Sequence, residues 1–239
     1  HDVLFELGLE EIPARFMPAI LADLKLKTSE KLFAARLSHG AIHILGTPRR
    51  LAVIIEKVPE FQGDLTREAK GPPKKVAFDA EGKPTAAAVG FARNSGVDVS
   101  QLTIKSDGGR EYVVAQIFEN GRPTKLILAS LFPEIIQSLY LPKSMRWGKG
   151  ELAFVRPIHW VTCFYGADLI RFHLGDLNVG PTTEGHRILT GSKEISLSLG
   201  RSGWLTSYRQ ALKSAHVMVD AAERKAMIRQ QIKTVGKGA

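Results

Sequence analysis

Cysteine is nearly absent from this sequence, and long apolar runs are missing altogether. The single cysteine, Cys163, cannot form an internal disulfide, so we expect a small buried side chain in a reducing, cytoplasmic compartment. No apolar run approaches the ~18 residues that a membrane-spanning helix needs, so no membrane span is predicted. The first residues lack a basic region followed by an apolar stretch, so nothing predicts secretion.

Acidic residues are scarce relative to basic ones. The chain has 24 Asp and Glu against 33 Lys and Arg, which gives a formal net charge of +9. This excess favours a polyanionic partner such as RNA over an acidic small molecule. A membrane surface ranks low as a partner, because no basic helix with aromatic anchors is evident.

Motifs that bind nucleotide phosphates or metals are also missing. The sequence contains neither GxGxxG nor GxxxxGK, so it predicts no phosphate cradle. His39 and His43 are four residues apart but straddle Gly40, so they are not expected to share a helical face. The remaining candidate ligands have no recognised metal spacing, and no metal site is predicted from His159, His173, His186 and Cys163.

Two adjacent carboxylates, Glu10 and Glu11, follow the first predicted strand. Successive strand residues point to opposite faces, so the two are not expected to act as a general acid and base on one substrate. Pairing with Arg49 or Arg50 is the favoured alternative. No Ser, His and Asp set stands in recognisable context, so an unrelated hydrolase ranks third. A cleft joining Glu10 or Glu11 to His159 would favour it.

Length and composition predict a folded chain with a substantial core. With 239 residues, 44% hydrophobic and 24% charged, the chain lies in the globular range, and folding should bury about 70% of its surface. The pattern predicts an α+β fold, mainly antiparallel sheet with helices packed on one face, plus a basic helical insert. The expected regions are an α/β unit over 1–60, the insert over 61–105, an α+β domain over 106–200, and a basic helical tail over 201–239.

Hydrophobic periodicity places the individual elements. Alternation predicts strands, and a period near 3.6 predicts helices. Pro133 should kink or split the helix that contains it, and Asp220 should cap the last helix. The expected strands are 3–9, 41–45, 51–58, 102–105, 111–118, 152–155, 158–165, 168–174 and 216–219, and the expected helices run to about 38 and over 85–94, 123–140, 204–214 and from 221.

One stretch combines cations with flat apolar side chains. Leu141-Pro-Lys-Ser-Met-Arg-Trp-Gly148 is followed by Val155-Arg-Pro-Ile-His-Trp160. Arginine can stack on a base or fork onto a phosphate, and tryptophan can cover a base, so the pattern suits RNA. The alternative is a core hairpin with a charged rim, in which His159 is a satisfied core histidine. The candidate RNA-binding residues here are Lys143, Arg146, Trp147, Arg156 and His159.

Two further pairs are candidates for RNA contact. Arg49 and Arg50 lie at a predicted hairpin turn, where they form either a phosphate clamp or a solvated pair. His186 and Arg187 follow Gly185, where they either contact RNA or close a turn.

Several motifs in order resemble one family. These are Leu4-Phe-Glu-Leu-Gly-Leu-Glu-Glu-Ile-Pro13, Gly46-Thr-Pro-Arg-Arg-Leu-Ala-Val53, Gly71-Pro-Pro73, Leu141 to Gly148, Phe154 to Val161 and Thr183-Glu-Gly-His-Arg187. Together they are similar to the β subunit of the bacterial-type, two-subunit glycyl-tRNA synthetase. The resemblance covers roughly the first third of that subunit, so the chain is expected to be an amino-terminal fragment.

The resemblance implies a function and partners. Family members form an α2β2 enzyme, glycine-tRNA ligase, that joins glycine to tRNA(Gly) with ATP. The α subunit carries the adenylate-forming site, so ATP and Mg are expected there, and no cofactor and no catalytic residue are expected in this chain. The working hypothesis is a positive face that positions the tRNA acceptor arm. The alternative is a purely structural scaffold that docks the α subunit without contacting tRNA.

Overall fold

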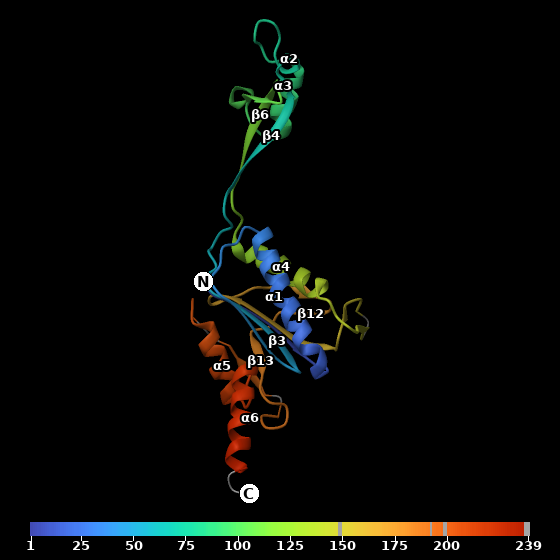
Figure 1. The fold of residues 1–239 in the computed structure, drawn as a ribbon, viewed down its shortest axis with the longest axis vertical. Helices are drawn as coiled ribbons and strands as arrows, with labels where there is room; N and C mark the ends of the chain where they lie inside the picture. Colours follow the sequence, from blue (N-terminus) through green and yellow to red (C-terminus); the bar gives the residue numbers. More distant parts are fainter. Residues whose placement is uncertain (148–149, 192, 198–199, 237–239) are drawn as a thin grey trace. The chain divides into compact units, whose positions relative to one another are not determined.

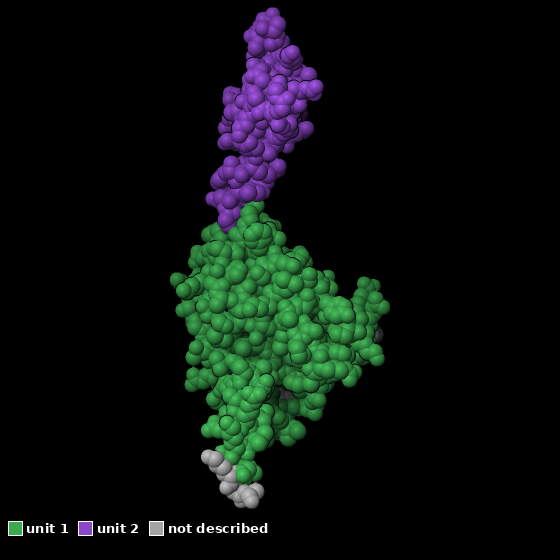
Figure 2. Space-filling view, in the orientation of Figure 1, with its two compact units in different colours: residues 1–62, 122–239 green, residues 63–121 purple. Residues whose placement is uncertain are grey.

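The computed structural model describes residues 1–147, 150–191, 193–197 and 200–236. The chain divides into two compact units, which Figure 2 colours separately. Unit 1 comprises residues 1–62 and 122–239, and unit 2 comprises residues 63–121. Helices and antiparallel sheets occur together, so the predicted α+β class is confirmed.

A five-stranded antiparallel sheet forms the centre of unit 1. Its spatial order is β10 (Asp168–Leu169), β9 (Ile158–Tyr165), β1 (Val3–Leu9), β3 (Arg50–Ile55) and β2 (Ile42–Thr47). The register places Phe5 opposite both Val53 and Cys163. The first predicted strand, residues 3–9, is therefore the middle strand of the sheet.

Two helices cover one face of this sheet, α1 (Met17–Ala34) and α4 (Thr124–Ser138) (Figure 1). The aromatic rings of Phe5 and Phe132 stack there, with centroids 4.3 Å apart. Pro133 was expected to kink or split the helix that contains it, and α4 is not split there. Burial of Phe132, Ile135 and Ile136 on both sides of Pro133 offsets the lost backbone hydrogen bond.

The opposite face of the sheet is buried as well, which the alternation in the first strand did not predict. Helix α5 (Trp204–Ser214) covers it with Trp204, Tyr208 and Leu212, which pack on Leu4 and other side chains of that face. Helices therefore lie on both faces, not on one. The predicted tail over 201–239 thus begins inside the core of unit 1, because α5 is one of the layers of that core.

The last helix, α6 (Ala221–Val235), begins as predicted at Asp220, whose carboxylate accepts hydrogen bonds from the backbone N–H groups of Ala222 (2.8 Å) and Glu223 (3.1 Å). Residues 216–219, predicted as a strand, form a loop between α5 and α6.

The remaining short elements of unit 1 are η1 (Ala14–Phe16) and the strand pairs β7 (Met145–Arg146) with β8 (Ala153–Phe154), β11 (His173–Leu174) with β12 (Leu177–Asn178), and β13 (Thr182–Glu184) with β14 (Glu194–Ser196).

Unit 2 is a small α+β unit of its own. Its sheet has the order β4 (Leu65–Pro73), β6 (Arg110–Glu119), β5 (Thr103–Asp107), and its helices are α2 (Lys74–Ala77), α3 (Ala86–Ser95) and η2 (Val99–Gln101). The β5–β6 turn contains Gly108 and Gly109, both with positive φ, which fits the predicted hairpin. A small core of Ala77, Ala88 and Val113 joins helices to sheet.

The boundary and charge of this insert differ from the expectation. The predicted insert over 61–105 was basic and helical, whereas the structural unit runs to residue 121 and includes a sheet. Over residues 63–121 the sequence has eight Lys or Arg and eight Asp or Glu, so unit 2 is formally neutral. The earlier boundary excluded Asp107, Glu111 and Glu119, which belong to the same sheet.

Candidate nucleic-acid interface and a buried ion pair

The turn after β1 gathers several of the predicted cations. Arg49, from the β2–β3 turn, places its guanidinium 3.1 Å from the Oε2 of Glu10, which confirms the expected pairing between this acid and the hairpin. The Nε2 of His159 lies 2.9 Å from the other oxygen, Oε1. The hydrogen bond from His159, helped by the charges of Arg49 and Arg187 and opposed by burial, lowers the pKa of Glu10. Glu10 is therefore a carboxylate at neutral pH.

His159 is exposed, not a core histidine. The register between β1 and β9 shifts between Gly8 and Leu9, so that Gly8 faces Trp160 and Leu9 faces Ile158. His159 falls in this irregularity, and such a bulge turns a side chain away from the regular alternation. The apolar neighbours that favoured a core position lie farther along the strand.

Two more predicted cations keep their charge uncancelled. The Nε of Arg156 donates to the backbone carbonyl of Glu11 at 3.0 Å, which fixes the guanidinium without neutralising it. Arg187 is exposed and close enough to lower the pKa of Glu10. Neither forms an ion pair with an acidic side chain of the residues that the structure describes.

A pocket of about 470 Å³ lies beside this turn. It is bounded by the β2–β3 turn, the loop after β13 and the α5–α6 loop, and it includes the predicted residues Arg49, Arg50, His186 and Arg187. The Nδ1 of His186 accepts from the backbone N–H groups of Ile188 (3.2 Å) and Leu189 (3.3 Å), so His186 closes the turn. Sequence reasoning missed His216 and Arg224, which also line the pocket, because neither belongs to a recognisable motif.

The hydrolase alternative is not supported by this geometry. His159 does contact Glu10, but neither residue lines the pocket. No serine or cysteine among the described residues is hydrogen-bonded to His159, and Cys163 is fully buried, which raises the pKa of its thiol. The contact is a surface hydrogen bond, without the nucleophile that acyl transfer requires.

Lys143, Arg146 and Trp147 lie on a separate ribbon, β7–β8. Lys143 and Arg146 are exposed, and the Nε of Arg146 donates to the backbone carbonyl of Glu151 at 3.3 Å. Trp147 is half-buried and packs against the main core, so the core interpretation applies to it. The last residue of this motif, Gly148, lies outside the described residues.

Arg50 belongs to the core, and this corrects its place among the RNA-contacting candidates. Its side chain is 3% exposed, and its Nε lies 3.3 Å from Oε1 of Glu6, which is 0% exposed. Burial alone would lower the pKa of Arg50, but the charge and hydrogen bond of Glu6, together with the charges of Tyr208 and Glu184, outweigh burial and raise this pKa. Arg50 lines the pocket, but its guanidinium is 3% exposed and already held by Glu6.

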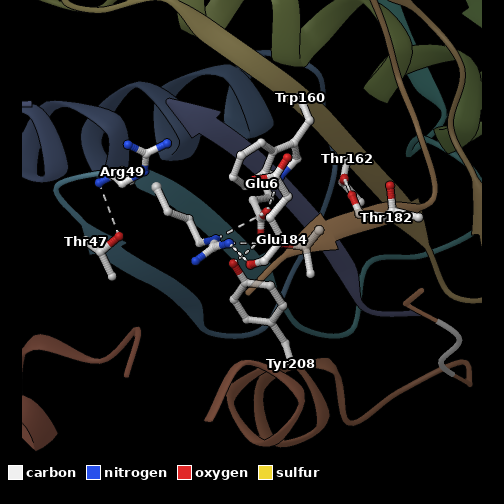
Figure 3. Close-up of polar contacts among 10 residues, drawn as sticks. Glu6, Thr47, Arg49, Trp160, Thr162, Thr182, Glu184 and Tyr208 are labelled. Atoms are coloured by element: carbon white, nitrogen blue, oxygen red, sulfur yellow. Dashed lines mark hydrogen bonds and ion pairs between the residues drawn. The ribbon is translucent and has the colours of Figure 1, made fainter. Parts of the chain in front are cut away.

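Glu6 is the centre of a network that joins five elements of unit 1. Figure 3 shows Glu6 between Trp160 and Tyr208. Trp160 Nε1 donates to it at 2.6 Å, and the hydroxyls of Tyr208 and Thr183 also donate to its carboxylate. A Cβ at Gly8 would lie 2.0 Å from the Trp160 ring, so glycine is required beside it. Glu6 lies on the second buried face of the sheet, which alternation within β1 alone cannot reveal.

Arg50 extends this network to the pocket. It donates from Nη2 to Thr183 Oγ1 at 3.2 Å and to the backbone carbonyl of Glu184. Glu184 directly precedes the Gly185-His186-Arg187 loop. The buried pair therefore anchors the base of a loop that lines the pocket.

No three His, Cys, Asp or Glu side chains of the described chain come together as a possible metal site. No described helix is both long and apolar enough to cross a membrane.

Comparisons with known proteins agree with one another. Residues 3–239 match the family model described as glycyl-tRNA synthetase beta subunit. The chain is 42% identical over 235 residues to the glycine–tRNA ligase beta subunit of Bacillus subtilis (strain 168), covering 98% of this chain and 33% of that protein. The same subunit of Desulforudis audaxviator (strain MP104C) is 42% identical over 232 residues, covering 97% and 33%. That of Geobacter metallireducens (strain ATCC 53774 / DSM 7210 / GS-15) is 38% identical over 238 residues, covering 100% and 34%. The chain thus spans about one third of the length of these relatives.

Proposed function

The chain belongs to the glycyl-tRNA synthetase β-subunit family, and on that premise we propose that it supports ATP-dependent aminoacylation of tRNA(Gly) by binding and positioning the tRNA. In this proposal it assembles with a catalytic α subunit in an α2β2 enzyme of the cytoplasm. ATP and Mg act at the α subunit, and this chain supplies no catalytic residue.

The observation that carries the proposal is the uneven distribution of charge. Unit 2 is neutral, so the whole formal charge of +9 belongs to unit 1. Phosphate contacts dominate the affinity of proteins for nucleic acids, and they require cations that acidic side chains do not cancel. Lys143, Arg146, Arg156 and Arg187 meet this condition among the described residues.

These cations have different roles in the proposal. Arg156 is held by the carbonyl of Glu11 and Arg146 by that of Glu151, so each guanidinium is oriented in advance and loses less freedom on binding. Arg187 is an exposed point of contact on a loop that the Glu6–Arg50 pair anchors. Arg49 already forms an ion pair with Glu10, so its charge is partly neutralised. His159 is hydrogen-bonded to Glu10 and would have to break this bond to stack on a base.

Salt-dependent binding of tRNA(Gly) to the assembled enzyme tests the proposal. Arg146→Ala and Arg156→Ala should each weaken binding and reduce the slope of log K against log salt by about 1. Lys105→Ala in unit 2 is the matched control, because it removes a cation that Glu68 already neutralises. Affinity and slope that match the unaltered enzyme for both arginine variants would remove these residues from the tRNA interface.

A scaffold role is the second candidate, and one observation favours it. Arg49 and Arg50, which were candidates for a phosphate clamp or a solvated pair, are instead paired with Glu10 and Glu6. In that case the chain docks the α subunit and does not contact tRNA. Co-purification with α, compared with an RNA mobility-shift assay on this chain alone, separates the two: a scaffold retains α and shifts no RNA.

A further inference from the structure

Helix α6 has no buried residue along its 15 positions. Four large apolar side chains are left open to solvent: Met227 (37% exposed), Ile228 (55%), Ile232 (65%) and Val235 (75%). A helix of this length is marginal in water without packing on one face. Its exposed apolar side chains therefore call for a covering surface.

The apolar side chains form a stripe with a charged border. Ile228, Ile232 and Val235 are spaced i, i+4, i+7, so they share one face of the helix. Lys225, Arg229 and Lys233 are spaced i, i+4, i+8 and run along one side of that stripe. We call this combined surface the α6 stripe.

The basic border has no acidic counterpart on the helix itself. The single acid of α6, Glu223, is bound by Arg209 at 2.8 Å and by Lys213 at 2.9 Å, both from α5. Lys225, Arg229 and Lys233 make no ion pair with any acidic side chain that the structure describes. Whatever covers the α6 stripe must therefore supply both an apolar surface and negative charge.

We propose that the α6 stripe is a docking face for an acidic amphipathic helix contributed by the rest of the same subunit. The curated relatives are about three times as long as this chain, so most of such a subunit lies outside these 239 residues. The apolar centre favours a protein helix over nucleic acid, because a phosphate backbone leaves isoleucine side chains uncovered. The basic border selects a helix with Asp or Glu beside its own apolar positions. This goes beyond the proposed tRNA contact, because it concerns assembly within the subunit.

Hydrogen exchange on the full-length subunit tests the proposal. The amides of α6 should exchange at least about tenfold more slowly there than in the 239-residue chain, because covering the helix suppresses its local opening. Ile232→Asp should abolish that protection. Gln230→Asp is the matched control, since it places the same side chain on the opposite face of the same helix and should leave the protection intact.

Zero-length coupling of amines to carboxylates identifies the occupant. With the same full-length subunit, Lys225 or Lys233 should couple to a segment beyond residue 239 that has apolar residues at i, i+4 and i+7 and acids beside them. Protection that appears only after adding the α subunit, only after adding tRNA, or only as the 239-residue chain dimerises would assign another occupant and overturn the proposal. Equal exchange in the two proteins would also overturn it.

Discussion

Both units of this chain carry exposed ion pairs, but unit 1 also contains a buried one. Unit 2 pairs its charges on the surface, where Lys105–Glu68, Arg67–Glu119, Lys70–Asp107 and Lys74–Glu111 link strands and helix with both partners at least 42% exposed. Unit 1 encloses one pair, Glu6–Arg50, at 0% and 3% exposed. The side chains are of the same kinds in both cases, and the pairs differ in their exposure to solvent.

The surroundings decide what each kind of pair does. An exposed pair gains little, because water screens the attraction and two long side chains must be ordered. A buried pair is costly to form, but removal of one partner strands a charge in the core. Glu6–Arg50 thus joins five elements in one arrangement, whereas the exposed pairs of unit 2 contribute little to its stability.

The largest expected effect is the loss of the buried acid. Glu6→Ala should lower the free energy of unfolding by about 3–5 kcal/mol, because it leaves Arg50 without a counter-ion and Trp160, Thr183 and Tyr208 without their shared acceptor. Urea unfolding followed by tryptophan fluorescence measures it. A loss below about 1 kcal/mol would place this pair in the same class as those of unit 2.

A double replacement sharpens the same comparison. Glu6→Leu combined with Arg50→Met removes both charges and keeps apolar volume, so it should cost less than Glu6→Ala alone. If the double variant were the less stable one, the hydrogen bonds of the carboxylate would outweigh the burial of charge.

Two glycines should respond with opposite signs in the two units. Gly8→Ala should destabilise unit 1 by about 1–3 kcal/mol, since the added Cβ would meet the Trp160 ring at 2.0 Å. Gly90→Ala should stabilise unit 2 by about 0.5–1 kcal/mol, because Gly90 lies in α3 with nothing within 4 Å of an added Cβ. Thermal unfolding of both variants checks the signs, and destabilisation by Gly90→Ala would show a contact that the structure lacks.

Sequence periodicity predicted the elements better than their arrangement. The strand over 3–9 and the helix over 204–214 were placed correctly, because each carries its own alternating or helical pattern. The second buried face could not be predicted, since it depends on α5 packing on Leu4 and Phe164 from distant parts of the sequence. The predicted insert ended at residue 105 because it was defined by the local excess of basic residues. The sheet of unit 2 adds acidic residues from later in the sequence, up to Glu119.

The candidate site shows the same limit at single residues. Arg49 and Arg50 are neighbours in one turn, and local pattern gives no reason to treat them differently. The strand register distinguishes them, because Arg50 lies opposite Gly8 in the sheet and points to Glu6, while Arg49 precedes the strand and reaches Glu10. The core alternative for His159 rested on strand alternation, which cannot reveal a one-residue bulge.

Exposed acids should titrate alike in the two units, because exposure and not the unit decides their behaviour. Hydrogen bonds from His159 and Lys70 lower the pKa values of Glu10 and Asp107, respectively. Each stabilising contribution is therefore complete above the ordinary pKa, 4.5 for Glu10 and 3.8 for Asp107, and is lost as the pH falls through the lower folded value. Carboxyl NMR titration should show His159→Asn raising the pKa of Glu10 and Lys70→Met raising that of Asp107. An unmoved Glu10 would mean that Arg49, not His159, holds it.

The smallest expected effect is the coupling between Lys105 and Glu68 in unit 2. Their side chains are 54% and 45% exposed, so a double-mutant cycle with alanine should give at most about 1 kcal/mol. The coupling should fall further in 1 M salt, where the screening length is about 3 Å. A coupling of several kcal/mol that persisted in 1 M salt would contradict this. An exposed pair would then stabilise as strongly as Glu6–Arg50, and burial would not explain the difference between them.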